Sequence, residues 1–114
     1  MSCIIERARV MTSGKRITIL GGIPYVWQKR NLEVALNCII LWSPAERGKR
    51  LRAVTNSVEG SDLIIVVVKL CSHALNDFAL CIRRAGGTPV VMAKAGLNPL
   101  RIAYDIVTQL SAPV

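Results

Sequence analysis

The chain has 114 residues, of which 52% are hydrophobic, and its formal net charge is +8. This length suits one domain with a core of its own. The charge favours an anionic partner, which would be a nucleic acid, a small molecule such as a nucleotide, or an acidic protein. No apolar run has the length of a membrane span, so we expect no membrane-spanning role.

Histidine and cysteine are too sparse for the common metal sites. There is one histidine, and the four cysteines lack the close C-x-x-C spacing of zinc ligands, so we expect neither a metal nor a cofactor. Residues 1–15 carry no continuous apolar segment of the kind that a secretion signal needs, which predicts a cytoplasmic protein with reduced thiols.

Residues 1–14 are predicted to be an N-terminal arm, and residues 15–114 a single domain. The arm mixes apolar with charged residues, which leaves a strand, a short helix or an oligomerisation segment open. The high apolar content also leads us to expect a homodimer with a buried face, and this face would include the arm.

Residues 16–20 predict a first strand that ends at Gly21 and Gly22. Two glycines at this point allow a sharp turn or a close approach of the backbone to a ligand. Pro24 fits the first turn of a helix that runs to Leu36. The apolar spacing of this helix is untidy, so its start is its least defined boundary. Its apolar positions are Trp27, Leu32, Ala35 and Leu36.

Residues 39–42 predict a second strand, which Ser43 and Pro44 end. A helix is expected to follow, because apolar residues recur at helical spacing from Leu51 to Val58. Its opposite face would be basic and would carry Arg47, Lys49, Arg50 and Arg52.

Residues 63–68 form an unbroken apolar run that is rich in β-branched side chains. Such a run is typical of a central parallel strand that is covered on both faces. Ser72 stands where the N-cap of the next helix is expected, and two glycines end that helix at residues 86–87.

Residues 88–93 predict the fourth strand, with Lys94 at its tip. Asn98 and Pro99 then begin the last helix as N-cap and first helical residue. Strands that alternate with helices predict a three-layer, Rossmann-like α/β domain. We expect a four-stranded parallel sheet of order 2-1-3-4, flanked by helices.

This order places a topological switch point between the first and third strands. Ligands of open α/β sheets bind at such a point, outside the carboxyl ends of the strands. A helix N-terminus at the same place favours an anion. Each position also has a structural explanation, such as a turn for the glycines and an N-cap for the serine. The predicted ligand-binding residues are Gly21, Gly22, Lys69, Ser72, His73 and Lys94.

Three short motifs together resemble the bacterial domain-of-unknown-function family 2325. They are a strand that ends in Gly-Gly (17–22), an Asp-Leu-Ile strand that leads to Ser-His (62–73), and Gly-x-Pro-Val-Val (87–91). The resemblance covers roughly residues 15–110 and implies a small Rossmann-like domain in which Ser72 and His73 are prominent. Lys69 stands near the place where the family has a Thr-Asp pair, and the resemblance implies no activity.

Three functions from different classes follow from these patterns. The first is a binding or regulatory module that holds an anionic small molecule, such as a phosphate or a nucleotide, at the strand tips. The second is a nucleic-acid-associated protein that uses the basic helix of residues 44–59. The third is an enzyme in which Cys71 and His73 act as nucleophile and base. The sequence leaves catalysis open and favours the binding role.

Overall fold

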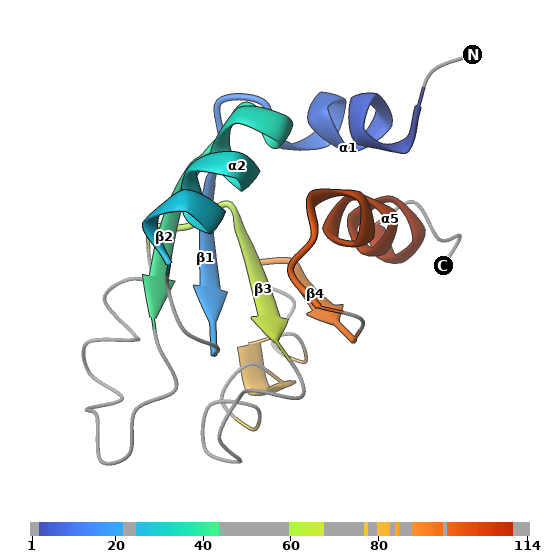
Figure 1. Ribbon diagram of the computed structural model, residues 1–114. Helices are drawn as coiled ribbons and strands as arrows, with labels where there is room; N and C mark the ends of the chain where they lie inside the picture. The colour runs from blue at the N-terminus through green and yellow to red at the C-terminus, as the bar shows by residue number, and fades with distance from the viewer. Residues whose placement is uncertain are drawn as a thin grey trace.

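In the computed structural model, four parallel strands form one sheet in the order β2-β1-β3-β4 (Figure 1). The strands are β1 (Arg16–Leu20), β2 (Ile39–Ser43), β3 (Leu63–Val67) and β4 (Val90–Ala93), and the helices with defined bounds are α1 (Ile4–Thr12), α2 (Val26–Leu36) and α5 (Pro99–Leu110). The structure describes residues 3–21, 25–43, 60–67, 77, 80–82, 84, 88–94 and 96–110. The predicted α/β fold, with this strand order and helices beside the sheet, is confirmed.

The first face of the sheet is covered by α1, α2 and α5. Because side chains alternate along a strand, Ile17 and Ile19 of β1 point to the same face as Ile65 of β3. They form one buried cluster with side chains of the three helices. The helical members of this cluster are Ala8 of α1, Leu32 and Leu36 of α2, and Ile102, Ala103, Ile106 and Val107 of α5.

The second face has its own apolar cluster. Leu20, Ile64, Val66 and Val90 are buried together, and Ile82 from the helical residues 80–82 packs against them. All five residues of β3 are therefore buried. This explains why the sequence of β3 is apolar throughout, as predicted for a strand that is covered on both faces.

Residues 4–12, which belong to the predicted arm, form helix α1 and pack against the C-terminal end of α2. The Arg9 Nε donates to the Ala35 carbonyl oxygen (2.9 Å). The buried Thr12 hydroxyl donates to the Leu36 carbonyl oxygen (2.8 Å). The Gly14 N–H donates to the Asn37 carbonyl oxygen (2.9 Å). The last carbonyl groups of a helix have no partner within the helix, so these bonds satisfy the end of α2.

Helix side chains also bond to the outer edges of the sheet. The Glu33 carboxylate of α2 accepts the Ile40 N–H of β2 (3.0 Å). On the other edge, the Gln109 side chain accepts the Met92 N–H (2.8 Å) and donates to the Met92 carbonyl oxygen (2.9 Å). These backbone groups would otherwise be open to pairing with another chain.

Of the two predicted helix starts, that of α5 is confirmed and that of α2 is wrong. Asn98 accepts the Leu100 N–H through its side chain (2.9 Å), and α5 begins at Pro99, as predicted. In contrast, α2 begins at Val26 after an extended Tyr25, so the prediction that the first helical turn lies at Pro24 is wrong. The predicted helix of residues 44–59 lies outside the described residues.

Candidate functional site

The chain leaves β1 and β3 toward opposite faces of the sheet. After β1 it continues into α2, whose Leu32 and Leu36 pack on the first face. After β3 it reaches Ile82, which packs on the second face. Adjacent parallel strands whose connections diverge in this way define a switch point, and the space outside their carboxyl ends is where α/β domains bind ligands.

Gly21 turns the chain at this point. It follows the last residue of β1, is buried, and has a φ of 99°. This value lies in the region that glycine adopts readily and that other residues avoid. The Trp42 indole Nε1 donates to the Gly21 carbonyl oxygen (2.8 Å), so the neighbouring strand β2 fixes the position of the turn. Trp42 itself is half-buried and packs against the core of the first face.

Lys94 is exposed directly after β4 and lies beside Asp105 of α5. Burial raises the pKa of the Asp105 carboxyl above its ordinary value of 3.8, while the Lys94 N–H, the Lys94 ammonium and the Arg101 guanidinium lower it by less. One oxygen of this carboxyl, Oδ2, is buried without a hydrogen-bond partner among the described residues. Lys94 therefore offers a cation at the strand tips that is partly offset by a neighbouring acid.

The structure thus places two of the six predicted ligand residues, Gly21 and Lys94. Their strands are separated by β3, which puts the two backbones roughly 10 Å apart. The other predicted positions lie outside the described residues, so they stay predictions of the sequence. They are Gly22, Lys69, Ser72 and His73 for the ligand, Cys71 and His73 for catalysis, and Arg47, Lys49, Arg50 and Arg52 for nucleic acid.

Among the described cysteines, Cys38 has no thiolate available for chemistry. Burial, and to a smaller extent the nearby Glu33 carboxylate, raises the pKa of the Cys38 thiol to about 12. Cys3 and Cys81 are exposed, and neither forms a disulfide within the described part of the chain. No group of three or more histidine, cysteine, aspartate or glutamate side chains within the described ranges could hold a metal ion.

An exposed aromatic pair at the start of α2 was missed by the sequence reasoning. Trp27 is one of the apolar positions named for this helix, and it is 63% exposed, while Tyr25 is 50% exposed. Only Leu32 and Leu36 of α2 are buried. The untidy apolar spacing of this helix was the available signal, because it reflects apolar side chains on the solvent side.

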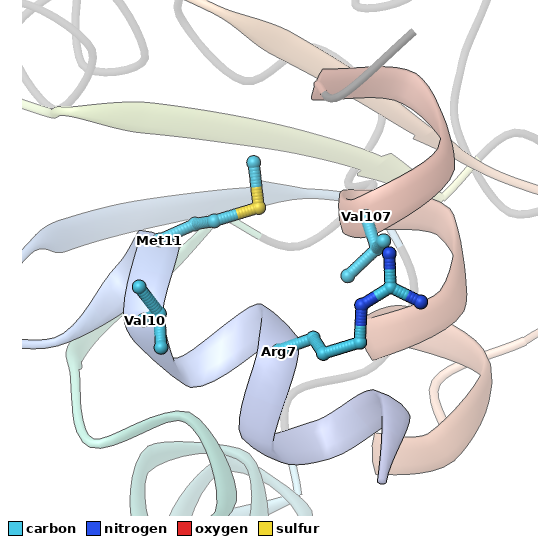
Figure 2. Close-up of a pocket in the computed structure, with 4 residues that line it drawn as sticks. All are labelled: Arg7, Val10, Met11 and Val107. Atoms are coloured by element: carbon cyan, nitrogen blue, oxygen red, sulfur yellow. The ribbon is translucent and has the colours of Figure 1, made fainter. Parts of the chain in front are cut away.

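A surface groove lies between α1 and α5. Helix α1 lies at the end of the sheet where the strands begin (Figure 1). It has a volume of about 280 Å³ and is lined by Arg7, Val10, Met11 and Val107. Figure 2 shows the Arg7 side chain reaching from α1 toward Val107 on α5. The groove is therefore separate from the switch point.

Comparisons with family models, with curated proteins and with solved structures each gave no match. The resemblance to the domain-of-unknown-function family 2325 accordingly stays a prediction. None of the helices in the described part of the chain has the length and apolar character needed to cross a membrane.

Proposed function

We propose that this domain is a binding module that holds an anionic small molecule, through a phosphate or carboxylate group, outside the carboxyl ends of β1 and β3. The observation that carries the proposal is the divergence of the two connections, with α2 on the first face and Ile82 on the second. Ligands of α/β domains bind outside the carboxyl ends of strands whose connections diverge in this way.

Three further features support an anionic ligand. Gly21 turns the chain sharply at the carboxyl end of β1, and the bond from Trp42 holds this turn in place beside the proposed site. Lys94 supplies an exposed positive charge at the tip of β4. The predicted Lys69, Ser72 and His73 follow β3 along the chain, and β3 is the neighbour of β1 in the sheet.

The experiment is a thermal-unfolding screen against phosphorylated metabolites, nucleotides and short nucleic acids at two salt concentrations. A ligand that binds only the native state raises its unfolding temperature. We expect a rise with a phosphorylated small molecule, and a smaller rise in a Lys94→Gln variant and in a Ser72→Ala/His73→Ala variant. Arg84→Gln, also an exposed basic residue, is the matched control for the loss of one charge.

Other outcomes would contradict the proposal. A rise with nucleic acid alone, unchanged in both variants and lost at high salt, would favour the nucleic-acid alternative. Rapid alkylation of Cys71 relative to the other three thiols would favour the enzyme alternative. The homodimer and the cytoplasmic location stay predictions of the sequence.

A further inference from the structure

The aromatic pair at the start of α2 has the geometry of a stacking surface. The rings of Tyr25 and Trp27 stack on each other, with centroids 6.1 Å apart and an angle of 24° between their planes. Both rings are at least half exposed. Tryptophan is strongly buried on average, so an exposed tryptophan that is held by a second ring is an unusual use of apolar surface.

The pair lies close to the switch point along the chain. Tyr25 comes four positions after Gly21, and a chain of this length spans at most about 14 Å. The aromatic rings are therefore within reach of a ligand whose anionic group sits beside Gly21. A ligand that used both would need a planar ring joined to an anionic group by a short spacer.

Positive charge stands on the same helix. Arg30 is exposed and follows Trp27 by three residues, which places both on one side of α2, and Lys29 is half-buried next to it. Aromatic rings with cationic neighbours bind nucleobases in many proteins, because bases stack on the rings while the cations attract phosphate.

We propose that the Tyr25–Trp27 pair is a platform on which the base of a nucleotide stacks, while its phosphate occupies the crevice at Gly21. This inference rests on the proposed function and narrows its ligand to a nucleoside phosphate. A mononucleotide fits better than a nucleic-acid strand, because a strand is bound by successive aromatic side chains along a groove. The described residues contain one stacked aromatic pair rather than a row of aromatic side chains, which suits one base.

The test compares three probes by calorimetry at one ionic strength: AMP, ribose 5-phosphate and inorganic pyrophosphate. In the wild type, AMP should bind at least about five-fold more tightly than ribose 5-phosphate, since stacking of a base adds to the affinity. Trp27→Ala should remove this difference and leave the affinity for ribose 5-phosphate unchanged. The same result is expected for Tyr25→Ala.

Tyr104→Ala is the matched control. Tyr104 is an exposed aromatic residue on α5 with a similar exposed fraction of 57%, so its replacement removes an equivalent ring from another helix. It should change neither affinity. Because Trp27 and Tyr104 are both exposed, their alanine variants are expected to fold like the wild type.

The possible failures are distinguishable. If AMP and ribose 5-phosphate bind equally, or if Trp27→Ala weakens all three probes alike, the platform is wrong and the anion crevice stands. If none of the three probes binds, the platform is wrong, and the thermal-unfolding screen decides separately whether the proposed function fails with it. If a short single-stranded oligonucleotide binds in a Trp27-dependent way but AMP does not, the pair serves nucleic acid and the inference is overturned.

Discussion

The two ends of the sheet are built from different kinds of residues. At the end where the strands begin, backbone and side-chain hydrogen bonds link α1, α2 and the strands. The Asp62 carboxylate accepts the Arg16 N–H (2.9 Å), and the Asp62 N–H donates back to the Arg16 carbonyl oxygen (2.8 Å). The Ile39 N–H donates to the Lys15 carbonyl oxygen (3.0 Å). At the end where the strands finish, the described residues include a glycine with positive φ, an exposed lysine and, after β1, an exposed aromatic pair.

Under the proposed function, this difference separates residues that stabilise the fold from residues that would bind the ligand. Polar groups at the first end are paired with one another, so they contribute to folding and have little capacity left for a ligand. At the second end, Lys94 is exposed, and Gly21 is a buried turn whose carbonyl oxygen accepts from Trp42. Substitutions at the two ends should therefore separate into effects on stability and effects on binding.

Thr12→Val should give the largest loss of stability among the variants considered, about 1–3 kcal/mol. The substitution keeps the shape of the side chain but removes the hydroxyl that donates to the Leu36 carbonyl oxygen, and this position is buried. Urea denaturation measures the loss of stability. The affinity for pyrophosphate, measured by calorimetry, should not change.

Thr108→Val is the matched control for that variant. The Thr12 hydroxyl also lies within hydrogen-bond distance of the Ala8 carbonyl oxygen, four residues earlier (3.1 Å). The Thr108 hydroxyl donates in the same way to the Tyr104 carbonyl oxygen, but on the exposed side of α5. Water can replace this bond, so we expect a change within about 0.5 kcal/mol. Equal losses of unfolding free energy in Thr12→Val and Thr108→Val would refute the claim that the paired polar groups where the strands begin stabilise the fold.

Trp42→Phe should have a smaller effect on stability, a loss of about 0.5–1.5 kcal/mol, and a clear effect on binding. Phenylalanine keeps most of the packing but cannot donate to the Gly21 carbonyl oxygen, so the turn after β1 loses its anchor. Calorimetry with pyrophosphate checks the binding.

Trp27→Phe is the control for this variant, because it keeps an exposed ring and should leave stability unchanged. A Trp42→Phe variant that is destabilised yet binds normally would remove Gly21 from the proposed site.

The sequence predicted those parts of the fold that local patterns determine. The run of residues 63–68 has the composition of a strand covered on both faces, and β3 is that strand. Asn98 and Pro99 are a local start signal, and α5 begins there. The strand order followed from short connections and right-handed crossovers, and the sheet has that order.

The parts that were not predicted depend on residues distant in the chain or on solvent exposure. Thr12 meets Leu36, and Trp42 meets Gly21, only after the elements have packed. The exposure of Trp27 was not predicted, because a pattern of apolar residues does not distinguish an exposed apolar surface from a buried face. The half of the candidate site that follows β3 rests on the sequence alone.

Asp105→Asn should have the smallest effect and the opposite sign, a gain in stability at pH 7. Because burial raises the pKa of Asp105 in the folded protein, the native state binds more protons than the unfolded state as pH rises above 3.8. The stability contributed by this group is therefore full at pH below 3.8 and is lost as pH rises through the folded pKa. Asparagine stays neutral and avoids this loss.

The measurement is the difference in unfolding free energy between Asp105→Asn and the wild type, taken at pH 7 and again at pH 3.5. The titration of all other groups largely cancels in this difference. The difference should favour the variant at pH 7 and shrink toward zero at pH 3.5. A variant that is less stable at pH 7 would show that the charged carboxylate beside Lys94 is net stabilising. In that case Lys94 would be committed to Asp105, and its place at the second end of the sheet would be structural.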